Sequence, residues 1–286
     1  MTHWLYDAGL VALGLFAGGY GTMVGLGGGF LLVPAFLFLH FDSRVAAGTS
    51  MAVVLANAAS GSVSYLRQKR VDVRSGVIFA IAGIPGAWLG AMADQVIPQR
   101  LFTVLFAILL AWVGIRLLTT ERRSHEELAE EASRDDEPRP GLLQERPTDL
   151  MTRDFVDAQG IRYTYSYNLA AGVAVSLGAG FLASAFGIGG GLVQVPAMVY
   201  MFGFPAHIAT ATSTLIIAST ALFGTASHAL YGDVAWSPAI LVAAGAVVGA
   251  QIGARLAKRV ASAPLLRLLA ISVLVTAVKL IWNAIA

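Results

Sequence analysis

The sequence predicts an all-α, polytopic membrane protein built from two inverted repeats of about five membrane segments each. Three observations support this fold class. The composition is strongly apolar, one glycine-rich element occurs in both halves, and the loop charges reverse between the halves. Of the 286 residues, 57% are hydrophobic and 13% are charged, whereas soluble domains carry about 25% charged residues. We therefore expect most of the chain to lie within a lipid bilayer.

Apolar runs that approach the length of a bilayer crossing, about 20 residues, occur in both halves. In the first half they lie near 5–24, 26–41, 45–66, 73–93 and 101–118. In the second half they lie near 168–186, 188–204, 208–231, 236–256 and 265–285. The second and seventh runs are short, so we expect short or discontinuous segments there, such as re-entrant or tilted half-spans. The chain thus divides into a first membrane repeat (1–118), a polar linker (119–167) and a second membrane repeat (168–286).

The glycine-rich element reads Gly25-Leu-Gly-Gly-Gly-Phe-Leu-Leu-Val-Pro34 in the first half and Gly187-Ile-Gly-Gly-Gly-Leu-Val-Gln-Val-Pro196 in the second. Each glycine weakens a helix by about 1 kcal/mol relative to alanine, so both copies favour an open backbone. Within a membrane, open backbone survives only where it is buried in protein or lines a wet cavity. Breaks at matching positions of two halves are typical of transporter binding sites at the bilayer midplane. Close helix packing is the alternative interpretation.

Two further motifs recur in the same order in both halves: a Thr-Ser pair and two glycines four residues apart. They occur as Thr49-Ser50 and Thr212-Ser213, and as Gly86/Gly90 and Gly249/Gly253. Glycines at this spacing in an otherwise intact run predict a helix-packing face. The order of the motifs indicates an internal duplication.

The loop charges indicate that the two halves have opposite orientations. The loop after the third run carries Arg67, Lys69, Arg70 and Arg74, and its counterpart in the second half carries only Asp233. The next loop reverses this bias, with Asp94 and Arg100 in the first half against Arg255, Lys258, Arg259 and Arg267 in the second. The positive-inside rule places both arginine-rich loops in the cytoplasm although they occupy different repeat positions.

The linker is rich in acidic residues and arginine, so it cannot enter lipid and is expected to be a solvated cytoplasmic connection. Near its end, Phe155 to Tyr165 with Gln159-Gly160 at the centre predict a small β-hairpin.

Hydrogen-bond donors near the glycine breaks are the candidate substrate-binding groups. A broken helix points free N–H groups and the positive end of its dipole at an anion. These backbone candidates are Gly27, Gly28, Gly29, Gly189, Gly190 and Gly191. The side-chain candidates are Thr49, Ser50, Asn57, Gln194, Thr212 and Ser213. His228 is the candidate proton carrier, although a single histidine near the end of a span is more often structural.

Several motifs are absent from the sequence, and the absences exclude function classes. No charged residue lies in the middle of a run, which disfavours cation transport. There is no phosphate-binding Gly-x-x-x-x-Gly-Lys-Ser/Thr loop, no His-Glu-x-x-His motif and no nucleophile elbow. Cysteine is absent as well. The sequence therefore predicts a protein that is not an enzyme and that needs neither a cofactor nor a metal.

The duplicated Gly-hydrophobic-Gly-Gly-Gly…Pro element followed by a Thr-Ser pair resembles the sulfite exporter TauE/SafE family. The resemblance covers both membrane halves and leaves out the linker. It implies a multi-pass permease of the bacterial inner membrane that moves small sulfur-containing anions, usually outward. One departure from symmetry is Leu32 in the first element against Gln194 in the second, which predicts a chemically one-sided site.

Together these observations predict a secondary transporter that exports sulfite or an organosulfonate such as sulfoacetate by alternating access. A negative cell interior drives such an anion outward without a coupling ion. Two alternatives stay open: a proton-coupled importer of a small organic anion, and a membrane scaffold that transports nothing. The expected partners are the anion and the lipid bilayer, and a net charge of +2 gives no reason to expect nucleic acid.

Overall fold

The computed structural model describes residues 2–112, 114–115, 139–140, 150–156, 160, 162–257, 274–275 and 277–280. The chain divides into two compact units. The first consists of Met1–Val96 and Arg139–Lys258, and the second of Ile97–Pro138 and Arg259–Ala286. The described part of the second unit includes a helix over Gln99–Trp112, which overlaps the predicted fifth run. Most of the predicted tenth run lies outside the described residues. The following description concerns the first unit.

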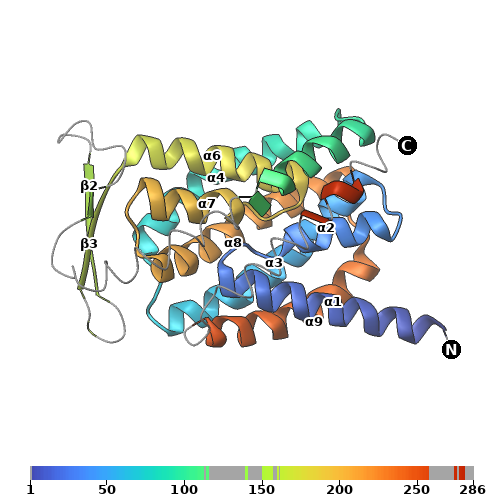
Figure 1. The fold of residues 1–286 in the computed structure, drawn as a ribbon, viewed down its shortest axis with the longest axis horizontal. Helices are drawn as coiled ribbons and strands as arrows, with labels where there is room; N and C mark the ends of the chain where they lie inside the picture. Colours follow the sequence, from blue (N-terminus) through green and yellow to red (C-terminus); the bar gives the residue numbers. More distant parts are fainter. Residues whose placement is uncertain are drawn as a thin grey trace. The chain divides into compact units, whose positions relative to one another are not determined.

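Six helices among the described residues are long and apolar enough to cross a membrane (Figure 1). They are α1 (Thr2–Val24), α3 (Ser43–Arg67), α4 (Val73–Asp94), α6 (Leu169–Phe186), α8 (Ala206–Tyr231) and α9 (Trp236–Leu256). Their bounds agree with the predicted runs to within a few residues. The prediction of a mainly helical, polytopic membrane protein is confirmed.

The predicted second and seventh runs form short helices. One is α2 (Gly29–Phe38), with 10 residues. The other is α7 (Gly191–Pro196), which continues into the π-helix η1 (Ala197–Met201). At 1.5 Å per residue each helical stretch spans about 15 Å, roughly half of the hydrocarbon core. The expectation that these two membrane segments are short is confirmed.

The long helices of the two halves are interleaved. α1 of the first half packs along α9 of the second, and α6 of the second half packs along α4 of the first (Figure 1). α3 packs on α8. Each half therefore buries its helices against the other half.

The glycines spaced four apart make this interleaving possible. A methyl group added at Gly249 would lie 2.2 Å from the Leu15 carbonyl oxygen. One added at Gly86 would lie 2.0 Å from the Leu177 carbonyl oxygen. Gly90 and Gly253 approach α6 and α1 in the same way. The predicted helix-packing face is confirmed, because only glycine permits backbones to come this close.

The end of the linker forms the predicted β-hairpin. Strand β2 (Leu150–Val156) pairs antiparallel with β3 (Arg162–Asn168), and the short β1 (Arg139–Pro140) pairs parallel with β3. The hairpin is not fully solvated, because Tyr165 and Tyr167 are buried against Phe79 of α4 and against Phe202 and Phe204, which lie between η1 and α8. Their rings lie 4.2 Å and 5.5 Å from the ring of Phe204.

Candidate functional site

The backbone opens at both glycine-rich elements, as the sequence predicts. Helix α1 ends at Val24 and α2 begins at Gly29, and α6 ends at Phe186 before α7 begins at Gly191. Glycines occupy left-handed conformations at corresponding positions of both breaks. The φ angles are 79°, 81° and 84° at Gly25, Gly27 and Gly28, and 68°, 84° and 73° at Gly187, Gly189 and Gly190. Since L-residues avoid this region, the two glycine loops have a backbone that only glycine adopts readily.

The two glycine loops lie against each other. A methyl group added at Gly29 would lie 2.3 Å from the Gly187 carbonyl oxygen, and one added at Gly191 would lie 2.3 Å from the Gly25 carbonyl oxygen. Gly29 and Gly191 are the first residues of α2 and α7. The structure therefore brings the N-termini of two short helices together at the contact between the halves.

The first N–H groups of these short helices are available as donors. Within the described part of the chain, the amides of Gly28, Gly29, Gly190 and Gly191 donate no hydrogen bond. The next amides turn back onto the loops: Leu31 donates to the Gly28 carbonyl at 3.1 Å. Unsatisfied N–H groups and the positive end of a helix dipole are the elements of an anion site.

The Thr-Ser pairs hold the glycine loops in place through matching hydrogen bonds. Ser50 donates to the Gly187 carbonyl at 2.7 Å, and Ser213 donates to the Gly25 carbonyl at 3.2 Å. Each serine thus binds the glycine loop of the opposite half. Since both hydroxyl protons are used, the serines position the loops in this conformation.

The threonines of the pairs accept hydrogen bonds from the backbone before the next helix. Thr49 accepts from the amide of Ala235 at 3.0 Å, and Thr212 accepts from the amide of Asp72 at 3.0 Å. These amides stand directly before α9 and α4. Each Thr-Ser pair therefore connects an interhelical loop to a glycine loop.

Asn57 also supports the first glycine loop. Its side-chain amide donates to the Gly27 carbonyl at 3.0 Å, and its oxygen accepts from Thr22 at 3.1 Å. Asn57 is 1% exposed, so its polar atoms must find partners inside the protein.

Beside the second glycine loop lies a small cavity. Its volume is about 10 Å³ measured at the centre of a water-sized sphere, room for about one water molecule. The lining includes Gly189, Gly190, Gln194, Ser176 and Thr220. The Gln194 amide donates to Ser176 at 3.3 Å, and the Gln194 oxygen is buried without a hydrogen-bond partner among the described residues.

The cavity lies beside Gln194, the position at which the two glycine elements differ, and its lining includes Ser176, which the sequence analysis missed. Leu32, the counterpart of Gln194, is buried and apolar. Ser176 was not among the candidates, although it lies four residues before Gly180 on a helix face that meets the second half's glycine loop. A serine at helical spacing from a packing glycine is the signal that could have identified it.

His228 does not lie at the glycine loops. It sits near the C-terminus of α8, where its Nε2 is 3.0 Å from the Ser184 carbonyl and its Nδ1 is 3.6 Å from Asp233. Ser184 belongs to the last turn of α6, shortly before the second glycine loop.

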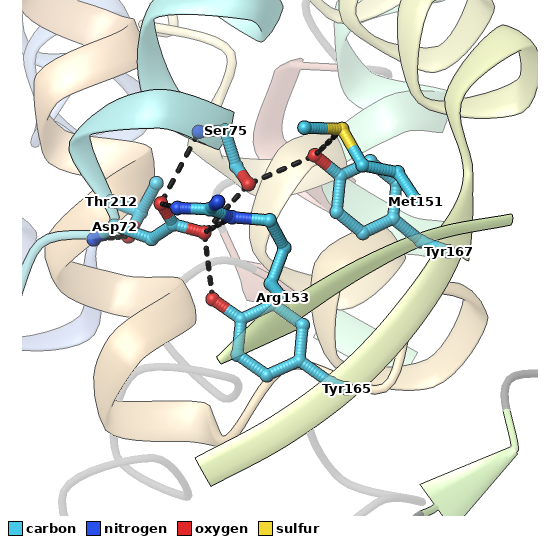
Figure 2. A network of polar contacts seen from close by, with 7 residues as sticks. All are labelled: Asp72, Ser75, Met151, Arg153, Tyr165, Tyr167 and Thr212. Atoms are coloured by element: carbon cyan, nitrogen blue, oxygen red, sulfur yellow. Dashed lines mark hydrogen bonds and ion pairs between the residues drawn. The ribbon is translucent and has the colours of Figure 1, made fainter. Parts of the chain in front are cut away.

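A second polar network, absent from the sequence-based candidates, anchors the hairpin to α4 (Figure 2). Arg153 of β2 donates to both oxygens of Asp72, at 2.9 Å and 3.2 Å. The Tyr165 hydroxyl donates to the same carboxylate at 2.8 Å, and the Tyr167 hydroxyl donates to Ser75 at 2.8 Å. We call Asp72, Ser75, Arg153, Tyr165 and Tyr167 the hairpin anchor.

Two sequence signals point to parts of the hairpin anchor. Asp72 and Ser75 fit a helix N-cap, and Ser75 donates both its amide and its hydroxyl to Asp72. Tyr163, Tyr165 and Tyr167 alternate as one face of a strand does. Neither signal predicts which residues pair, because the contact between Arg153 and Asp72 joins positions about 80 residues apart.

The anchor makes the protein sensitive to acid. Burial raises the pKa of Asp72, but hydrogen bonds from Arg153, Ser75 and Tyr165 outweigh this and hold the pKa below its usual value. Its stabilising contribution is therefore complete above the unfolded pKa of about 3.9 and is lost as the pH falls through the lower folded pKa. We expect the melting temperature to fall steeply below about pH 4, and less steeply in Asp72→Asn. Parallel melting curves over a pH series for both proteins would contradict this assignment.

Comparison with known proteins places the fold in a family. The model described as sulfite exporter TauE/SafE matches residues 10–280. The probable membrane transporter protein YunE of Bacillus subtilis (strain 168) is 33% identical over 284 residues, which cover 96% of this chain and 97% of that protein. A probable membrane transporter protein of Xylella fastidiosa (strain Temecula1) is 28% identical over 288 residues, covering 97% and 94%. No solved structure matches. Because the family match spans nearly all of the chain and its relatives are described as membrane transporters, the chain belongs to the sulfite exporter TauE/SafE family of membrane transporters.

Proposed function

We propose that this protein is a secondary transporter that binds a small sulfur-containing anion between its two glycine loops and exports it across the bacterial inner membrane. The observation that carries the proposal is the meeting of two helix N-termini whose amides at Gly28, Gly29, Gly190 and Gly191 have no acceptor among the described residues. Sulfite and sulfonates present several oxygens that accept charge-assisted hydrogen bonds. The name of the matching family model supports this substrate class.

The anion binds first at the second glycine loop. The buried Gln194 side chain can donate through its amide, and Ser176 and Thr220 add hydroxyl groups beside Gly189 and Gly190. The cavity has room for about one water molecule, so this conformation is closed and the anion enters when the loops separate. Because Ser50 and Ser213 tie each loop to the other half, their hydrogen bonds break and re-form during opening.

Inverted repeats and alternating access belong to the same proposal. The amide of Asp72 meets Thr212 near the start of α8, while the amide of Ala235 meets Thr49 near the start of α3. These reciprocal contacts support an antiparallel relation between α3 and α8, which occupy the same repeat position. A rocking motion of one part of each repeat around the glycine loops would expose the site to either side in turn.

The electrical driving force favours export. A membrane potential acts on an anion with about 2.3 kcal/mol per charge per 100 mV, directed outward when the cell interior is negative. The carboxylates of the described helices lie at helix ends, as with Asp94, and none is at the middle of a candidate span. A divalent anion keeps this outward force even when one proton accompanies it.

Ligand-induced thermal stabilisation tests the site. Sulfite or sulfoacetate at a hundred times its dissociation constant should stabilise the purified protein by about 2.7 kcal/mol. Gly190→Ala should abolish this shift, because alanine adopts the φ of 73° at this position only with strain and its methyl group would lie 3.2 Å from the Ala179 carbonyl oxygen at the cavity wall. The matched control is Gly178→Ala in α6, where a methyl group meets nothing within 4 Å.

The outcome separates the proposal from the scaffold alternative. Selective stabilisation by sulfur-containing anions over acetate and chloride, lost in Gly190→Ala and retained in Gly178→Ala, supports an anion site at the loop. If both variants show the same thermal shift, the second glycine loop is not part of the anion site. Stabilisation by none of the anions, together with no anion flux in proteoliposomes, would favour a protein whose glycines only pack helices.

A further inference from the structure

A cluster of titratable side chains lies at the C-terminal end of α4, at the opposite end of that helix from the hairpin anchor. Asp94 is the last residue of α4 and is 0% exposed. Both of its carboxylate oxygens are buried, and neither has a hydrogen-bond partner among the described residues. The charged groups that act on it are Asp233, between α8 and α9, and Arg44 of α3. An ionised carboxylate that is buried without a donor is costly, so this group binds a proton more readily than a hydrated carboxylate does.

The imidazole of His228 faces Asp233 in a geometry that a bound proton would stabilise. A backbone carbonyl can only accept, so the His228 Nε2 that lies 3.0 Å from the Ser184 carbonyl carries a hydrogen. In the neutral ring Nδ1 then has a lone pair, and it lies 3.6 Å from an oxygen of Asp233. Two acceptors face each other unless a proton is added to one of them.

Access to solvent is graded across the cluster. The Asp233 side chain is 12% exposed, whereas that of His228 is 0% exposed. Gln95, next to Asp94 in the chain, donates its side-chain amide to Asp233 and so brings the end of α4 to this loop. A proton can therefore reach the buried groups through Asp233.

From this geometry we propose that Asp94, His228 and Asp233 form a proton-binding site that takes up a proton when the anion binds at the glycine loops. The coupling rests on the proposed function, since it needs a bound anion. The proton adds one positive charge to the protein, so binding of an anion and of a proton favour each other, and this relation is reciprocal.

Two short connections join the cluster to the second glycine loop. His228 contacts the Ser184 carbonyl in the last turn of α6, which ends directly before Gly187. The Ala235 amide, two residues after Asp233, donates to Thr49, and the neighbouring Ser50 holds the Gly187 carbonyl. If the loop that carries Asp233 moves when the site is protonated, the movement therefore reaches the second glycine loop, whose free amides bind the anion.

The proton site can be tested without any anion. Difference infrared spectroscopy of the purified protein across pH should show the C=O band of a buried carboxylic acid, and Asp94→Asn should remove it. The control is Asp7→Asn in α1, an exposed position that should leave the band unchanged. Absence of the band in the wild type at every pH, or its persistence in Asp94→Asn, would overturn the proton site whatever the protein transports.

The coupling is tested by calorimetry with sulfoacetate, whose acid groups stay ionised near neutral pH. Binding heats in two buffers of different ionisation enthalpy report the protons taken up per anion. We expect about one proton in the wild type and close to none in Asp94→Asn, because the amide at position 94 cannot take up a proton. Equal uptake in both proteins would overturn the coupling. If sulfoacetate and sulfite do not bind the wild type at all, the proposed function fails while the infrared result still decides the proton site.

Discussion

Replacing Gly191 by alanine is expected to destabilise the protein by about 3 kcal/mol or more, at the upper end of the cost of overpacking. The added methyl group would lie 2.3 Å from the Gly25 carbonyl oxygen and 2.6 Å from the Leu26 Cα. Gly191 does not have a positive φ, so alanine is compatible with its backbone conformation. The effect therefore comes from the close packing around the added methyl group, chiefly against the first glycine loop. Thermal unfolding in detergent measures it, and Gly29→Ala should behave alike because its methyl group meets the Gly187 carbonyl.

Gly178→Ala is the matched control, since it adds the same methyl group to α6 in open space. It should be neutral or stabilise the protein by up to about 1 kcal/mol through helix propensity. If Gly191→Ala melts like the control, the two glycine loops are not in contact, and the anion site built between them loses its basis.

The second large effect is expected at the hairpin anchor. Arg153→Ala leaves the Asp72 carboxylate, which is 1% exposed, without its cation. Removing one partner of a buried ion pair costs about 3–5 kcal/mol, because the other charge stays buried and uncompensated. Thermal unfolding should show the loss, and limited proteolysis should show earlier cleavage in β2 and β3 as the hairpin leaves α4.

Two variants make this prediction specific. Arg162→Ala in the same hairpin removes an ion pair with Asp154 that spans 3.9 Å between side chains 71% and 58% exposed, so it should cost less than about 1 kcal/mol. Asp72→Asn combined with Arg153→Ala should be more stable than the sum of the single changes, because no buried charge is left unpaired. Additive losses in the double variant would show that the ion pair is not the source of the effect.

The hairpin shows what local sequence patterns predict about the structure and what they do not. The segment from Phe155 to Tyr165, with Gln159-Gly160 at its centre, predicted a hairpin, and its strands β2 and β3 are present. The linker as a whole was expected to be solvated from its charge, yet Tyr165 and Tyr167 are buried against Phe79, Phe202 and Phe204. A composition averaged over the linker does not reveal that one face of one strand is apolar enough to dock.

The glycine loops illustrate the opposite case. Clustered glycines break a helix wherever they stand, so the positions of both breaks followed from the residues alone. The hydrogen-bond partners of the two glycine loops did not follow from the residues alone. Ser50 and Ser213 were expected near the loops, but that each holds the carbonyl of the opposite half is a property of the interleaved packing.

The sequence by itself determined the membrane helices, the two broken ones, the packing glycines and the family resemblance, because each depends on hydrophobic length, glycine content or a local motif. Only the tertiary structure decided that the two helix N-termini meet, that Arg153 pairs with Asp72, and that Asp94 is buried near Asp233. Asp94 stands at the end of an apolar run, where a carboxylate is ordinarily hydrated. Whether such a group is wet or buried depends on neighbours from other helices, and the residues beside it in the chain carry no information about them.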